Sequence, residues 1–196
     1  MDLSSFINRL NCLSGIKFDL EGKIEKLSQQ EYRGKRAHIT VRDTPGYIIH
    51  SKIDLGVHAR AEIEQEDYCF DVCVDDEGAS LLINSKEQIF VEKLCSLLRW
   101  GVFSTRFKDV YDIYYLSNFL DVNRLLKYLD IYIFSDSSMR ENCLDDVLNR
   151  MRGIFANGSY IKLLEKSESA NWMNVDPSLA MKGILCFLSG LSSPNT

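Results

Sequence analysis

The sequence has 196 residues, enough for one domain of ordinary size or for two small ones that share a core. With 45% hydrophobic residues, 11% aromatic residues and only 3 prolines, it is too apolar to be disordered or collagen-like. A net charge of −5 argues against a surface that grips nucleic acid all over, although it allows a local basic groove.

No stretch approaches the roughly 18 consecutive apolar residues that a membrane-spanning helix needs. Near the N-terminus, Asp2, Arg9 and Asn11 interrupt the segment where a signal peptide would have an apolar core. These features predict a cytoplasmic protein with no membrane partner. The six cysteines form no CxxC pair, which predicts reduced core residues rather than a zinc site or a disulfide framework.

The first half of the chain predicts an α+β region. Ser4 or Ser5 can cap a short helix that ends near Gly15. Alternation of polar and apolar residues then predicts a meander of strands with one polar face. The strands are expected at 16–27, 37–41, 47–57, 68–74 and 80–83. The region ends near Asn84.

The second half is expected to be all helical, because the hydrophobic period changes at Ser85. Helices are expected from Ser85, and at 105–119, 122–134, 139–157 and 177–191. The first two are apolar nearly all round, so their few charged side chains must have partners. We therefore predict two parts: an α+β core at 1–84, and a helical part at 85–196 that packs on it.

Those charged side chains form the first candidate site. They are Glu92 and Lys93 on the first helix and Arg106, Lys108, Asp109 and Asp112 on the second. Asp109 and Asp112 are three residues apart and share a helix face, and a short turn containing Gly101 lets the helix with Lys93 pack against that face. Two interpretations stay open: a buried ion-pair network that fixes how the helices pack, and a functional site.

Strand carboxylates form a second group of candidates. Asp54 lies between two apolar residues near a strand end and just before Gly56, as metal ligands and general bases often do. Asp19 and Glu21 share one strand face and could chelate Mg²⁺ for two-metal phosphoryl transfer. For Asp54 the alternative is the exposed face of a half-buried strand. For Asp19 and Glu21 it is a solvated strand face, which is favoured because charged residues at 17, 23, 25 and 26 continue the polar pattern.

Basic side chains in the first half are weaker candidates. His38, His50 and His58 have no serine or cysteine partner at a motif spacing, so we expect surface or strand histidines. A cluster at a predicted turn could meet phosphate, although a solvated loop is the favoured interpretation. Its members are Arg33, Lys35 and Arg36.

Residues 85–116 resemble a known family. Val91-Glu92-Lys93-Leu94, then Gly101, then the run from Ser104 to Tyr114 looks like the "EKL … NSRxKDxYDL" signature of the AbiEii/AbiGii nucleotidyltransferase toxins of type IV toxin–antitoxin systems. Upstream, the segments at 32–36 and 52–56 have the order and spacing of the family's "YxGxR" and "IDIG" segments. The resemblance spans roughly residues 13–120.

The resemblance implies a polymerase-β-like nucleotidyltransferase core with a helical C-terminal part. It implies Mg²⁺-dependent transfer of a nucleotidyl group from an NTP to RNA; some relatives modify tRNA acceptor ends, and many act in toxin–antitoxin or abortive-infection systems. Catalytic roles are implied for Asp54, Lys93 and Asp112, with Asp54 also a metal ligand. Nucleotide binding is implied for Lys93, Arg106, Lys108 and Asp109.

The N-terminal motifs of the family are missing from this sequence. Family members open with a Gly-Gly/Ser loop and a strand bearing "DIDF", and nothing before Asp54 matches these. We therefore expect an incomplete sheet and metal site, through a natural truncation or a misplaced start, and weak or no activity of the chain alone. The alternative is a catalytically silent binding module for an antitoxin or for a second copy, because a shortened sheet favours homo-oligomers.

Overall fold

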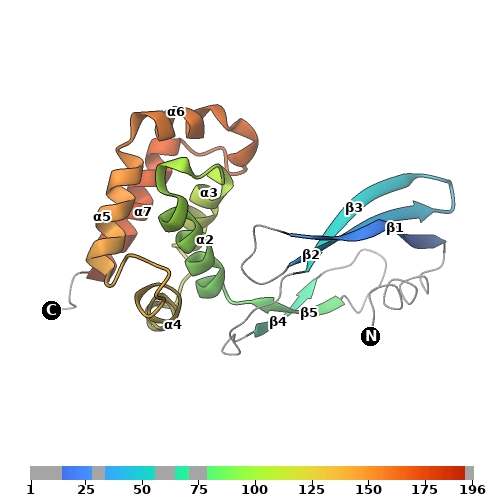
Figure 1. Ribbon diagram of the computed structural model, residues 1–196, viewed down its shortest axis with the longest axis horizontal. Helices are drawn as coiled ribbons and strands as arrows, with labels where there is room; N and C mark the ends of the chain where they lie inside the picture. Colours follow the sequence, from blue (N-terminus) through green and yellow to red (C-terminus); the bar gives the residue numbers. More distant parts are fainter. Residues whose placement is uncertain (1–14, 28–33, 56–64, 71–78, 193–196) are drawn as a thin grey trace. The chain divides into compact units, whose positions relative to one another are not determined.

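The computed structural model describes residues 15–27, 34–55, 65–70 and 79–192 (Figure 1). The chain divides into two units, Met1–Ile63 and Glu64–Thr196. The described part is α+β, as predicted: small antiparallel sheets come first and helices follow. The helix expected at 4–13 lies outside the described residues, and the predicted domain boundary at residue 84 stays a prediction.

The first unit contains a three-stranded antiparallel sheet in the order β1-β2-β3. Its strands are β1 (Ile16–Lys26), β2 (Lys35–Asp43) and β3 (Ile48–Leu55), which confirms the predicted meander. β2 lies in the middle, and its Ala37 and Ile39 are buried, whereas β3 is almost entirely exposed. The positions opposite one another in this sheet decide which polar side chains meet.

Two glycines allow the sheet to bend and turn. Gly22 has a φ of +64° within the irregular pairing between Glu21 and Glu25, where a β-bulge needs a left-handed residue. Gly46, with a φ of +94°, closes the β2–β3 turn, in which the backbone N–H of Tyr47 donates to the Asp43 carboxylate at 2.8 Å.

The second unit begins with a two-stranded antiparallel sheet. β4 (Gln65–Phe70) pairs with β5 (Ala79–Asn84). β5 was predicted closely, but β4 begins three residues before the strand predicted at 68–74, whose last four residues lie outside the described part. Arg124 Nη1 lies 2.6 Å from Glu66 Oε1 and so ties this hairpin to the helices that follow.

Helices form the rest of the second unit (Figure 1). They are α2 (Lys86–Trp100), α3 (Phe107–Leu116), α4 (Val122–Leu129), α5 (Leu144–Phe155), α6 (Gly158–Lys166) and α7 (Pro177–Ser192). All six contribute buried side chains to one hydrophobic core, in which α2 packs on α3 and α4, and α5 packs on α7. Within the described residues, no helix is long and apolar enough to cross a membrane.

Several helix boundaries differ from the sequence prediction. The helix predicted at 139–157 begins only at Leu144; just before it, the backbone N–H of Asn142 donates to Asp146 in the first turn at 3.0 Å, which stabilises the helix start at this point. Helix α6 was not predicted at all. The Asn157 side chain caps it by accepting from the backbone N–H groups of Ser159 and Tyr160, at 3.1 and 2.9 Å. Residues 130–134 form a π-helical turn after α4.

The cysteine prediction was partly wrong. The four cysteines in the described part are free thiols, and Cys12 and Cys73 lie outside it. Only Cys95 is buried, however, and Cys69, Cys143 and Cys186 are exposed. Cysteine is apolar enough for a core but small enough to lie on a helix or strand surface without cost, so its position inside an apolar run did not decide its burial.

Candidate functional site

A tight turn brings α2 and α3 together. Ser85 caps the start of α2 by accepting from the backbone N–H of Gln88 at 3.2 Å, and the helix ends at Gly101, whose φ is +55°. This left-handed conformation favours glycine and lets the chain reverse through a short 3₁₀ turn at Gly101–Phe103 before α3 begins. The packing of α2 on α3 then places Lys93 beside the acidic face of α3.

Lys93 lies between two carboxylates. Its Nζ donates to Asp112 Oδ2 at 2.7 Å and to Asp109 Oδ1 at 3.1 Å. The Lys93 side chain is 20% exposed, and the two carboxylates are only 4% and 12% exposed. The prediction that these opposite charges meet is confirmed.

Each carboxylate has further partners. Asp112 Oδ1 accepts from the Trp172 indole Nε1–H at 2.8 Å, and Lys108 Nζ lies 3.8 Å from Asp112 Oδ2. Arg106 Nε lies 2.8 Å from Asp109 Oδ2, although this contact lacks hydrogen-bond geometry and leaves that oxygen with no hydrogen-bond partner in the described part. We call Lys93, Arg106, Lys108, Asp109 and Asp112 the ionic cluster.

The cluster keeps Lys93 protonated. Burial alone lowers the pKa of Lys93, but the hydrogen bond to Asp112 and the charge of Asp109 outweigh it, so its pKa lies above the ordinary value. The neighbouring Tyr160 hydroxyl is fully buried with no hydrogen-bond partner among the described residues. Burial, followed by the charge of Asp109, raises the pKa of Tyr160, so this phenol stays neutral.

The exposed side of the cluster is basic. Arg106 and Lys108 are 62% and 65% exposed, whereas the carboxylates that hold them are buried. Glu92, which was grouped with them from the sequence, instead accepts from Gln88 Nε2 at 2.9 Å. Three cations and two carboxylates leave a charge of +1, and this charge is presented to solvent by the two cations.

Trp172 is the part of the site that the sequence analysis missed. It follows α6 in a loop, sixty residues after its partner Asp112. It also contacts Tyr115 edge-on, with ring centroids 5.4 Å apart. Its sequence neighbourhood has no motif, so only the packing of this loop against α3 could show that it belongs here.

Asp54 lies in the other unit and has a partner of its own. Arg36 faces it across β2 and β3, and the guanidinium Nε and Nη2 donate to the two Asp54 oxygens at 2.6 and 2.7 Å. These bonds hold the pKa of Asp54 below its usual range. Lys35 and Arg36 lie in β2, so their assignment to a solvated loop was wrong; Arg33 lies outside the described residues.

The other strand carboxylates are also engaged within the sheet. Glu21 accepts from Thr40, and His50 Nδ1 lies 2.9 Å from Glu21 Oε1. The hydrogen bond from Thr40, followed by the influence of His50, lowers the pKa of Glu21. Asp19 instead faces Arg42, at 3.7 Å. The two carboxylates therefore have separate partners.

A magnesium ion does not fit the described residues as they stand. Nowhere in the described ranges do three His, Cys, Asp or Glu side chains come together as metal ligands would. Both oxygens of Asp54 are occupied by Arg36. The metal-binding and catalytic roles of Asp54 therefore stay predictions, as does its expected orientation towards Lys93. His58 is outside the described part.

Comparison with known families found a match that includes the ionic cluster. A sequence model described as "Nucleotidyl transferase AbiEii toxin, Type IV TA system" matches residues 4–155, well over half of the chain. The chain belongs to the AbiEii family. The AbiEii match includes all five members of the ionic cluster and ends in α5, so Trp172 lies beyond it. No curated protein matches the chain in sequence.

Proposed function

We propose that this chain binds a nucleoside triphosphate at the ionic cluster and acts as a nucleotidyltransferase on RNA such as tRNA. The observation that carries the proposal is Lys93, fixed by two buried carboxylates beside two exposed cations. A buried ion pair alone is weak evidence for function, because its desolvation penalty often exceeds its Coulombic gain. The AbiEii match and the exposed cations favour a phosphate site over a purely structural network.

Lys93 is suited to hold a phosphate oxygen. Its ammonium has three N–H donors, and the contacts with Asp109 and Asp112 use two of them. The side chain is 20% exposed, so the third donor can reach a ligand. The raised pKa keeps the positive charge at neutral pH.

Arg106 and Lys108 would add the charge that a triphosphate requires. Both are mostly exposed, and Arg106 can offer a planar pair of donors to one phosphate group. In nucleotidyl transfer, an acceptor oxygen bonds to the α-phosphorus while the bond to pyrophosphate breaks. Cations near the departing pyrophosphate stabilise its growing negative charge, which is the role we propose for these two side chains.

Asp109 and Asp112 act in this proposal as positioning residues. Both Asp112 oxygens already accept hydrogen bonds, one from Lys93 and one from Trp172, so Asp112 is poorly placed to take a proton from the acceptor. Its contribution is to orient Lys93 and to keep it charged. Because the described residues do not fit Mg²⁺, we assign no step to the metal.

Nucleotide binding can be tested on the full chain by equilibrium dialysis with each labelled NTP. Arg106→Ala/Lys108→Ala is the test variant, because both side chains are exposed and their loss should leave the fold intact. Lys162→Ala is the control, since Lys162 is exposed on α6 and makes no ion pair within the described part. We expect the double variant to bind at least about fivefold more weakly and the control to bind like wild type. Equal binding by all three would refute the site.

Transfer is tested by incubating the chain with each NTP labelled at the α-phosphate, Mg²⁺ and total tRNA. Because the described residues do not fit Mg²⁺, we expect at most weak labelling of RNA, and we expect it to disappear in the double variant. Binding without labelled RNA would favour the alternative, a catalytically silent binding module. One observation supports that alternative: Arg36 occupies both oxygens of the carboxylate predicted to bind metal.

Partners follow from the same proposal. The family belongs to type IV toxin–antitoxin systems, so we propose that a cognate antitoxin counters this chain.

The mostly exposed edge strand β3, with Ile48 and Ile49 at 54% and 63% exposure, supports self-association. Light scattering of the purified chain would measure its mass, and a monomer at all concentrations would exclude a homo-oligomer.

A further inference from the structure

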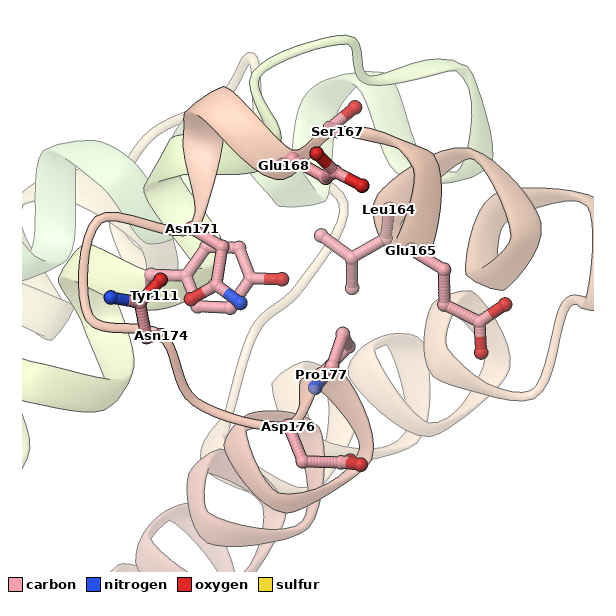
Figure 2. A pocket seen from close by; sticks show the side chains of 9 residues that line it. All are labelled: Tyr111, Leu164, Glu165, Ser167, Glu168, Asn171, Asn174, Asp176 and Pro177. Atoms are coloured by element: carbon pink, nitrogen blue, oxygen red, sulfur yellow. The ribbon is translucent and has the colours of Figure 1, made fainter.

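A cavity of about 410 Å³ lies between α6 and the start of α7 (Figure 2), and none of its lining residues is a member of the ionic cluster. Its buried lining includes Tyr111 and Leu164, and its more exposed lining includes the carboxylates of Glu165, Glu168 and Asp176. Apart from Tyr111, these residues follow the segment that the AbiEii match covers. The cavity therefore belongs to a part of the chain for which the family gives no role.

The cavity is acidic and has no cation of its own. None of its lining residues is lysine or arginine. Within the described ranges, the carboxylates of Glu165 and Glu168 make neither an ion pair nor a hydrogen bond. Asp176 uses Oδ1 to cap α7 through the N–H groups of Ser178 and Leu179, which leaves Oδ2 available.

Tyr111 gives an independent indication that a ligand binds here. Its side chain is fully buried in α3, yet its hydroxyl oxygen points into the middle of the cavity (Figure 2). That hydroxyl makes no hydrogen bond to any residue that the structure describes. The hydroxyl oxygen is not one of the fully buried polar atoms that lack a partner, so it is the tip of this buried side chain that the cavity leaves within reach of a ligand. A donor that enters the cavity can therefore bind it in place of water.

The neighbouring groups do not satisfy this hydroxyl themselves. The Asn171 side chain closes a loop by donating to the Val175 carbonyl and accepting from the Val175 N–H, at 2.8 and 3.2 Å. Asn174 holds a left-handed turn with a φ of +52°. The loop thus shapes the cavity wall, and the oxygen atoms of Tyr111 and the carboxylates are left to face a ligand.

We propose that this cavity binds an organic cation, an alkylammonium or guanidinium group. Such a group has several N–H donors spread over its surface and can reach the Tyr111 oxygen and the carboxylates together. A bare metal ion fits less well, because no three metal-type side chains among the described residues are close enough to share one ion. An anion is excluded by the three carboxylates. The volume lies within the roughly 300–1,000 Å³ of small-molecule sites.

The same cation chemistry could come from two sources. One is a free amine such as spermidine, and the other is an arginine or lysine side chain of a partner protein. None of the cavity's lining residues belongs to the ionic cluster, although Tyr111 precedes Asp112 in α3 and Asn171 precedes Trp172.

Binding can be measured on the full chain by NMR, through the side-chain amide signals of Asn171 and Asn174, which line the cavity. The probe is N-acetyl-arginine amide, and its neutral isostere N-acetyl-citrulline amide is the matched ligand control. Glu165→Gln/Glu168→Gln removes two charges with little change of shape, and Tyr111→Phe removes only the hydroxyl. Asp145→Asn is the protein control, because Asp145 is exposed on α5 and lies outside the cavity.

We expect saturable binding of the arginine probe in the millimolar range and none of citrulline. The double variant should bind at least about fivefold more weakly, Tyr111→Phe measurably more weakly, and Asp145→Asn like wild type. Equal binding of citrulline, equal affinity of the double variant and the control, or tighter binding of Mg²⁺ alone than of the arginine probe would overturn the proposal. Titration with spermidine and with a Gly-Gly-Arg-Gly-Gly peptide then distinguishes the two sources, and failure of all three cations would also refute it.

Discussion

The substitution Lys93→Met tests how much the buried charges of the α2–α3 pair depend on one another. Methionine preserves the length and apolar stem of lysine while removing the ammonium. Asp109 and Asp112, with side chains only 4% and 12% exposed, would then lose their shared cation. The free energy of unfolding of the second unit should fall, because a buried carboxylate without its partner is strongly unfavourable.

The size of this loss of stability depends on which contacts Asp109 and Asp112 keep without Lys93. Removing one partner of a fully buried pair costs about 3–5 kcal/mol. Here Arg106 still lies 2.8 Å from Asp109, and Asp112 keeps the Trp172 indole N–H at 2.8 Å. Lys93 is itself 20% exposed, so water can partly replace it. We therefore expect a loss of about 2–3 kcal/mol, below the fully buried value.

Urea unfolding followed by tryptophan fluorescence is the appropriate assay. The chain has two tryptophans, Trp100 and Trp172, and both lie in the second unit, so the signal reports that unit alone. The midpoint of Lys93→Met should fall by about 1 M urea or more, given slopes of roughly 1–3 kcal/mol per M.

Two further variants make the result interpretable. Lys162→Met replaces an exposed lysine with the same residue and should leave the midpoint almost unchanged. Lys93→Met/Asp112→Asn should recover part of the loss, because a neutral amide needs no counter-charge. If Lys93→Met lowers the midpoint no more than Lys162→Met does, the carboxylates do not depend on Lys93 and the reasoning is wrong.

Three other outcomes are expected. The pKa of Lys93 is raised above its ordinary 10.5, so the charged side chain contributes its full stabilisation below pH 10.5 and loses it as the pH rises through the folded-state pKa. Free energies of unfolding measured from pH 9 to about 12 should therefore fall less steeply for Lys93→Met than for wild type. Gly183→Ala should destabilise α7 by about 1–3 kcal/mol despite alanine's better helix propensity, because the new methyl group would overlap the Tyr114 ring, and a midpoint at or above wild type would contradict this contact. Arg36→Gln should raise the pKa of Asp54 towards its ordinary range, as measured by NMR titration, and an unchanged pKa would show that Arg36 is not the cause.

Local patterns in the sequence determined most of the helices and strands, and also the contacts of Lys93 with Asp109 and Asp112. The period-2 alternation at 16–27 and the helical period after Ser85 reflect how each backbone presents its side chains, which neighbouring residues suffice to encode. The same is true of Asp109 and Asp112, whose separation by three residues places them on one helix face. With the turn at Gly101, that spacing was enough to predict the contacts of Lys93.

Contacts between distant segments were decided by the tertiary structure alone. Trp172 reaches Asp112 across sixty residues, and the β2–β3 register sets Arg36 opposite Asp54 and so occupies a carboxylate predicted to bind metal. The cavity that Tyr111 faces exists only because the loop after α6 folds back over α3. Spacing along the chain specifies which way a side chain points from its own helix or strand. The partner that it meets depends instead on how several elements pack, and this packing is fixed by burial of the shared core.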